Sequence, residues 1–189
     1  MVKTAEAPLR IKLIPFWYGH GRYSVWHHNP DGTRVAVPYG TVIGDSVDID
    51  PKAKIGKNVT LGDHAIIGKK AIVGDGCILG RRVLLGDYSE LGEKVELAER
   101  VRILQYSSIG DKSQLGFGCE VGESCNISYQ VVLGDHCVIQ NGASIGSSSR
   151  LEEGARILTG VKLPWLSLIE PNATITVKRA RQLNEQNNP

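Results

Sequence analysis

The side chains best suited to chemistry in this 189-residue chain are five histidines and four cysteines. Histidine most often serves as a general base, because its ordinary pKa lies near neutrality. His64 and His136 are the candidate catalytic residues, and each directly follows an aspartate. The other three histidines, His20, His27 and His28, lie near the N-terminus.

A repeat with a period of six residues must position these side chains. It runs without a break from Thr33 to Thr176 and divides this segment into 24 hexads. Every fifth place is Val, Ile or Leu, and no third place holds a residue larger than valine. Third and fifth side chains point to the same side of a strand, so each hexad predicts one short strand with a small and a large inward residue. Glycine at many sixth places predicts a corner with unusual backbone dihedrals.

This pattern resembles the hexapeptide-repeat family, which includes the hexapeptide acyltransferases and the γ-class carbonic anhydrase-like proteins. The resemblance implies an all-β fold, a left-handed parallel β-helix of triangular section with three hexads per coil. The left hand comes only from the resemblance, because parallel crossovers are otherwise right-handed in ~98% of cases. Twenty-four hexads would form eight coils, about 38 Å tall at the usual strand spacing.

The four cysteines, Cys77, Cys119, Cys125 and Cys137, all occupy third places and should point inward. Cys119 and Cys137 are 18 residues apart, so they would stack on adjacent coils within the range of a disulfide. A reducing compartment and the small residues at equivalent places favour free thiols instead. The chain has no Cys-x-x-Cys spacing of the kind that binds metal.

The resemblance implies two kinds of chemistry as alternatives, zinc binding and acyl transfer. Carbonic anhydrase-like relatives bind zinc through three histidines, but His64 and His136 are 72 residues apart, about 19 Å along one column. We therefore expect no metal site. Acyltransferase relatives use a histidine base and CoA between subunits, so acetyl-CoA is the expected ligand if this chain is such an enzyme. The unbroken repeat leaves no acceptor-binding loop, and His64 and His136 can equally be ordinary surface residues.

One outward side of the repeat is a candidate subunit interface. Ile66 and Leu84 stack directly there at fourth places, and a ladder of apolar side chains favours contact between subunits. The full set of interface candidates is Ile66, Leu84, Phe117, Val138, Arg82 and Arg100. With the resemblance, this ladder predicts a homotrimer.

Charge is distributed in bands along the repeat. Residues 51–86 are predominantly basic and residues 87–99 predominantly acidic, although the net charge is only +2. The bands predict either solvated coils or lateral docking of a protein partner with opposite banding. They argue against nucleic acid, which the acidic band would repel.

The two ends do not follow the repeat. Residues 1–32 predict a small β cap, with strands over 10–18 and 22–26, a turn at 19–21 and another at Asn29–Gly32. Its Trp, Phe and Tyr side chains are expected to cover the first coil. Residues 177–189 form a basic and polar tail that predicts a short helix or a frayed end, with a partner-binding arm as the alternative.

We expect a cytoplasmic protein, since the sequence has neither a membrane span nor a secretory signal pattern. The leading functional prediction is a non-catalytic assembly protein that uses a rigid trimeric β-helix as a scaffold and needs no cofactor. The alternative is a CoA-dependent acyltransferase with its active site at the subunit clefts, and whether the chain is an enzyme stays open.

Overall fold

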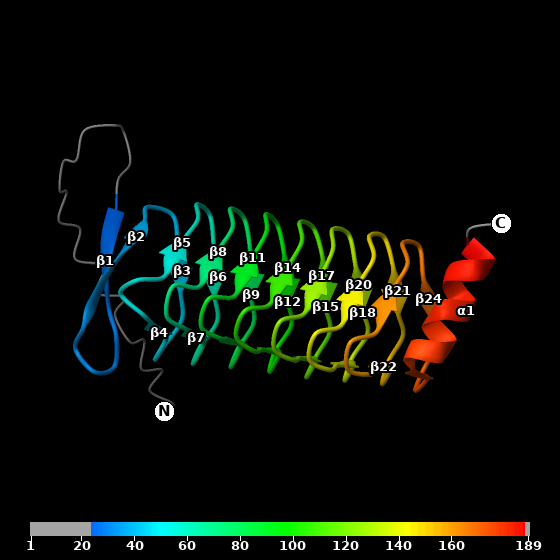
Figure 1. Ribbon diagram of the computed structural model, residues 1–189. Helices are drawn as coiled ribbons and strands as arrows, with labels where there is room; N and C mark the ends of the chain where they lie inside the picture. The colour runs from blue at the N-terminus through cyan, green and yellow to red at the C-terminus, as the bar shows by residue number, and fades with distance from the viewer. Residues whose placement is uncertain (1–23, 188–189) are drawn as a thin grey trace, which may run out of the picture.

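The computed structural model describes residues 24–187 of the chain. Within this range a β-hairpin, a parallel β-solenoid and a C-terminal helix follow one another (Figure 1). The hairpin consists of β1 (Ser24–His28) and β2 (Arg34–Pro38), and the helix is α1 (Val177–Asn187). Between them, two-residue strands wind into three parallel sheets, which form the three faces of the all-β parallel β-solenoid predicted from the repeat. This architecture is consistent with the left-handed β-helix that the resemblance implies.

The strands of each face are as follows. Face 1 contains β4 (Asp48–Ile49), β7 (Ile66–Ile67), β10 (Leu84–Leu85), β13 (Arg102–Ile103), β16 (Glu120–Val121), β19 (Val138–Ile139), β22 (Arg156–Ile157) and β25 (Thr174–Ile175). Face 2 contains β5 (Lys54–Ile55), β8 (Ile72–Val73), β11 (Glu90–Leu91), β14 (Ser108–Ile109), β17 (Asn126–Ile127), β20 (Ser144–Ile145) and β23 (Lys162–Leu163). Face 3 contains β3 (Val42–Ile43), β6 (Thr60–Leu61), β9 (Ile78–Leu79), β12 (Glu96–Leu97), β15 (Gln114–Leu115), β18 (Val132–Leu133), β21 (Arg150–Leu151) and β24 (Leu168–Ile169).

The core is the inner wall that the repeat predicted. From Val59 to Ser167 every third place is buried, and from Leu61 to Ile175 every fifth place is buried. Leu85, Ile103 and Val121 stand one above another as register partners in β10, β13 and β16. Backbone N–H groups of one coil donate to carbonyl groups of the next, as from Leu84 to Val101 at 2.9 Å. Each coil is therefore held by stacked side chains and by hydrogen bonds along the solenoid axis.

The backbone dihedrals at the corners differ from the prediction made for the sixth-place glycines. The first and second places before face 1 make up corner 1, and corners 2 and 3 precede faces 2 and 3 in the same way. Left-handed backbone occurs at the second places, from Gly40 to Asn172 with the exception of Lys52, and not at the sixth-place glycines. Glycine at the sixth place instead permits close approach between coils: a Cβ on Gly110 would lie 2.6 Å from the Tyr129 nitrogen.

Aspartate at first places also joins neighbouring coils. The Oδ1 atoms of Asp87, Asp111 and Asp135 accept backbone N–H groups from the preceding coil, each at 2.8 Å. Asn141 does the same for the N–H of Glu123 at 3.0 Å. The aspartates at first places thus contribute to the stacking of the coils.

The N-terminal boundary differs from the prediction. The first hexad forms β2, which pairs antiparallel with β1 instead of joining the coils, so residues 34–38 belong to the hairpin. The faces contain eight, seven and eight strands, which gives seven complete coils where eight were predicted. The turn at Asn29–Gly32 is confirmed by the hydrogen bond from Gly32 N–H to the Asn29 carbonyl at 2.9 Å.

Of the aromatic side chains expected to cover the first coil, only Trp26 lies within the described residues. Val35 and Val37 are buried and Val25 packs against the same core, whereas Trp26 is 49% exposed and does not fill the end. The Asn29 side chain pairs with both backbone groups of Ile49, accepting its N–H at 2.9 Å and donating to its carbonyl at 2.7 Å. The predicted strand over 10–18 and the turn at 19–21 lie outside the described residues.

At the other end the basic tail forms α1, as one of the alternatives predicted (Figure 1). Thr176 directly precedes the helix, and its Oγ1 accepts the backbone N–H of Arg179 at 3.3 Å. Ala180 is buried and Leu183 packs against the core. The helix therefore closes the last coil and leaves its basic face in solvent.

Candidate functional site

Both candidate histidines lie on corner 1, four coils apart. His64 donates its backbone N–H to the Asp45 carbonyl and His136 to the Phe117 carbonyl, each at 2.8 Å. Both have left-handed backbone and both side chains are exposed. The separation between them agrees with the prediction that they cannot share one metal ion.

The surroundings of the two rings differ. The imidazole of His136 lies edge-on to Phe117, with 5.3 Å between ring centroids and 79° between ring planes. In the preceding coil Gly118 has no side chain, and a Cβ there would lie 3.0 Å from His136 Nδ1. His64 has Ser46 at the corresponding place. Phe117 and Gly118 thus form a seat for the His136 ring, with Nδ1 as the ring atom nearest to where a side chain on Gly118 would begin.

Arg100 extends this arrangement by one coil. Its guanidinium carbon lies 5.4 Å from the Phe117 ring centroid, on the corner that also carries Arg82. Arg100, Phe117 and His136 therefore form a stack across three successive coils. The sequence offered His136 as a candidate base and Phe117 and Arg100 as interface candidates, and it missed the stack that they form. The 18-residue spacing of Arg100, Gly118 and His136 could have indicated the stack, because residues 18 apart lie at the same place of successive coils.

The other interface candidates lie on face 1. Ile66 and Leu84 are register partners, Ile66 is 46% exposed, and Leu84 and Val138 are half-buried. Between Leu84 and Val138 stand Arg102 and Glu120, whose side chains approach to 3.6 Å. A shallow groove of about 200 Å³ follows this face from Arg102 to Asn141. It contains no histidine, and its charged groups are already paired with each other.

Within residues 24–187, no three His, Cys, Asp or Glu side chains lie close enough together to bind a metal ion. His27 instead lies with Nε2 at 2.9 Å from the Val47 carbonyl oxygen, in the hairpin that covers the first coil. His20 is outside the described residues. The only helix in the described range is too short and too polar to span a membrane.

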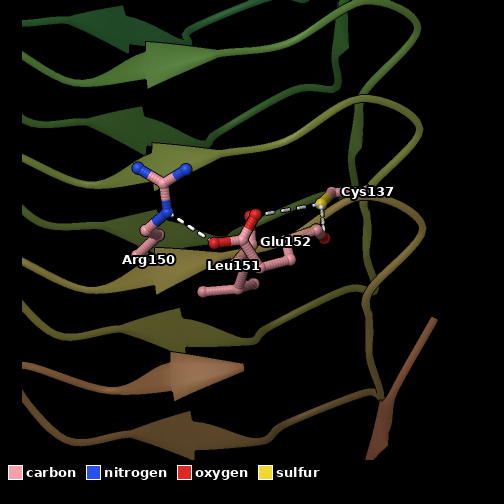
Figure 2. A network of polar contacts seen from close by, with 4 residues as sticks. All are labelled: Cys137, Arg150, Leu151 and Glu152. Carbon is pink, nitrogen blue, oxygen red and sulfur yellow. Dashed lines mark hydrogen bonds and ion pairs between the residues drawn. The ribbon is translucent and has the colours of Figure 1, made fainter. Parts of the chain in front are cut away.

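The cysteines belong to the inner wall, as predicted, and all four are buried free thiols. Burial raises the pKa of Cys77 and Cys125. Hydrogen bonding to Cys137, together with burial, raises the pKa of Cys119. Cys137 donates to the Glu152 carbonyl of the next coil at 3.1 Å, while the Glu152 side chain pairs with Arg150 on the outer surface (Figure 2). These thiols are structural, because they point into the core and away from the solvent-exposed candidate site residues.

One protein-family model matches part of the six-residue repeat. The model of the family "Bacterial transferase hexapeptide (six repeats)" covers residues 52–87. This match and the fold confirm the resemblance to the hexapeptide-repeat family that the sequence predicted. No sequence among curated proteins matches it.

Two solved structures that this chain resembles are of acyltransferases. A variant of AntD, an N-acyltransferase from Bacillus cereus in complex with dTDP and coenzyme A, has a TM-score of 0.55 at 16% identity, over 77% of this chain and 89% of that one. UDP-N-acetylglucosamine O-acyltransferase (LpxA) from Moraxella catarrhalis has a TM-score of 0.44 at 19% identity, over 69% of this hexapeptide-repeat chain. This chain spans only 63% of that enzyme. At 16% identity the similarity to AntD shows the fold alone.

Proposed function

We propose that this hexapeptide-repeat protein is a CoA-dependent acyltransferase in which His136 is the general base. The observation that carries the proposal is the seat of the His136 ring: Phe117 contacts its edge and Gly118 leaves room for it. At the corresponding places His64 has Asp45 and Ser46 instead of an aromatic residue and a glycine. AntD, whose solved structure contains coenzyme A, shares the fold and supports this function over the scaffold predicted first.

In this proposal each group has a role. An acceptor hydroxyl or amine would donate a hydrogen bond to Nε2 of His136, since Nδ1 lies only 3.0 Å from where a Cβ on Gly118 would be. As the acceptor attacks the thioester carbonyl, the imidazole takes its proton. The carbon–sulfur bond then breaks, and the imidazolium returns the proton to the thiolate of CoA. Phe117 keeps the ring in place, and Arg100 keeps Phe117 in place from the other side.

Binding of acetyl-CoA is the first test. Saturating acetyl-CoA should stabilise the wild-type protein by about 2.7 kcal/mol at one hundred times its dissociation constant, as a rise in melting temperature. No stabilisation, together with assembly into larger particles, would contradict the enzyme and support the scaffold.

The base assignment has a matched control within the chain. We expect His136→Ala to lower the rate of CoA release with a panel of amine and hydroxyl acceptors by about 100- to 10,000-fold and to leave acetyl-CoA binding intact. His64→Ala removes the same side chain from the same corner four coils earlier and should leave the rate unchanged. Equal effects of the two substitutions would exclude His136 as the base.

A further inference from the structure

Three large apolar side chains are exposed together at one corner of the last coil. Trp165 and Leu166 are the first and second places of corner 3, and Leu168 in β24 follows on face 3. Their exposed fractions are 61%, 58% and 66%. No other four consecutive residues within the range 24–187 expose three large apolar side chains. We call these three residues the apolar tip, and a cluster of this kind marks a contact surface.

Leu166 is an unfavourable residue for its own backbone conformation. Its φ is 54°, in the left-handed region that glycine and asparagine adopt most readily. Asn58 and Asn172 occupy second places with φ of 54° and 56°. From Gly40 to Asn172 every other second place holds glycine, a polar or charged residue, or tyrosine. Folding of the corner therefore does not require leucine, and its presence indicates a role for the exposed side chain.

The backbone that carries the apolar tip is held by the preceding coil. The Leu166 N–H donates to the Ser147 carbonyl at 2.9 Å, and the Ser167 N–H donates to Ser149 Oγ at 3.1 Å. Within the corner itself, Ser167 Oγ donates to the Pro164 carbonyl at 2.8 Å. The tip is thus displayed on an ordered backbone, so binding a partner would cost little backbone entropy.

Cations lie at the same end of the solenoid. Helix α1 lies across the last coil and contacts β23, the strand that leads into the apolar tip (Figure 1). Residues 154–187 contain five cations and two carboxylates, a net charge of +3. The cations are Arg156, Lys162, Lys178, Arg179 and Arg181, and the carboxylates are Glu170 and Glu185. None of the five cations forms an ion pair with a residue in the described range. This end of the molecule is therefore suited to an anionic partner.

We propose that the C-terminal end of the solenoid binds the surface of an anionic lipid bilayer. The apolar tip enters the interfacial region of the bilayer, and the cations of α1 lie among the lipid headgroups. Tryptophan is favoured at this depth, because its ring is apolar and its indole N–H can donate a hydrogen bond. Contact of this kind involves one leaflet and requires no membrane-spanning helix.

The shape of the tip favours lipid over a protein partner. A corner of a triangular solenoid is convex, and the left-handed residue Leu166 lies at its turn. A convex apolar tip needs a matching pocket on a protein, whereas lipid molecules can rearrange around it. Lysine is depleted at protein interfaces, but its ammonium group suits lipid phosphates.

Cosedimentation of the full-length protein with lipid vesicles tests the proposal. Vesicles of phosphatidylcholine mixed with phosphatidylserine should bind at least about tenfold more tightly than vesicles of phosphatidylcholine alone. Added salt should weaken the binding, because it screens the cations. No binding, or equal binding to both kinds of vesicle, would contradict the proposal.

The contribution of α1 has matched controls in the middle of the solenoid. Lys178→Gln and Arg181→Gln should each weaken binding to the anionic vesicles about fivefold. Lys94→Gln and Lys112→Gln each remove one cation from corner 3 in the middle coils and should leave binding unchanged. Equal losses in both pairs would show attraction to the protein as a whole and exclude a site at this end.

Leu166→Asn separates binding from folding. Asparagine suits left-handed backbone, so this variant should melt at a higher temperature than the wild type. Loss of the apolar side chain should nevertheless weaken vesicle binding about tenfold. Trp165→Ser should weaken it at least as much, whereas Tyr129→Ser, at the same place of corner 3 two coils earlier, should not. A Leu166→Asn protein that binds as tightly as the wild type would overturn the proposal.

Tryptophan fluorescence identifies the part of the chain that enters the bilayer. Vesicles with brominated acyl chains should quench the wild-type protein, and Trp165→Phe should bind them but lose most of the quenching. Quenching that persists in this variant would mean that another tryptophan enters the lipid. If Trp165→Ser instead lowers association between copies in sedimentation and leaves vesicle binding unchanged, the tip is a protein interface and the proposal is wrong.

Discussion

At the scale of single residues, glycine has two separate uses in this solenoid. Gly110 at a sixth place has ordinary backbone dihedrals, and its hydrogen-only side chain lets Tyr129 of the next coil approach. Gly142 at a second place has φ of 68° and open space around it. Serine, lysine and histidine also occupy second places with left-handed backbone, so this conformation is tolerated at the corners.

The two uses predict different losses in the free energy of unfolding when the glycine is replaced by alanine. Gly110→Ala should lower the free energy of unfolding by about 3 kcal/mol, because the new methyl group meets backbone that cannot move aside alone. Gly142→Ala should cost about 1 kcal/mol from backbone strain. Midpoints of urea denaturation would measure both. A larger loss at Gly142 would show that dihedral strain, and not coil spacing, selects glycine.

At the scale of elements, the hairpin and α1 solve the same problem at opposite ends. The end strand of a parallel sheet has backbone groups without a neighbouring strand, and these must be paired or covered. In the hairpin the buried side chain of Asn29 pairs with both backbone groups of Ile49 in β4. At the other end α1 lies across the last coil with Ala180 against the core.

Asn29 is therefore expected to be the most sensitive polar position of the hairpin. Asn29→Ala should lower the free energy of unfolding by about 2 kcal/mol, because it leaves buried backbone groups of Ile49 without partners. Asn29→Asp should not rescue it, since a carboxylate cannot donate to the Ile49 carbonyl. Thermal denaturation of both variants gives the comparison. An aspartate variant as stable as the wild type would show that the donated bond is unimportant.

At the scale of the whole molecule, contacts reach only from one coil to the next. Register pairs link β10 to β7 and β13, and the same pattern repeats on all three faces. Stability in such a solenoid is approximately a sum of single coils and of the interfaces between neighbours. Loss of structure should therefore begin at the ends, where a coil has one neighbour instead of two.

Hydrogen exchange of the native protein can measure this gradient. The slowest backbone amides should lie in the middle coils, around β10 to β16, with faster exchange toward β3 and toward β25. Deleting α1 should speed exchange in the last coil more than in the first. Uniform protection along the chain would mean that the solenoid opens as one unit.

The sequence by itself determined the solenoid, its inner wall and the positions of the buried thiols, because a six-residue period places the same side chain in the same environment at every turn. It could also predict His136, Phe117 and Arg100 one by one. It assigned Arg34–Pro38 to the first coil, because Val35 and Val37 keep the repeat even though their strand pairs with β1. Pairing depends on which backbone edge is free, and a periodic pattern carries no information about that.

Only the tertiary structure decided what each corner brings together. It separated His136, seated on Phe117 and Gly118, from His64, although the two occupy equivalent hexad places. It also assigned the sixth-place glycines to coil spacing and the left-handed backbone to the second places. The physical reason is that these properties depend on the residue 18 positions away, in the neighbouring coil, and not on the local hexad.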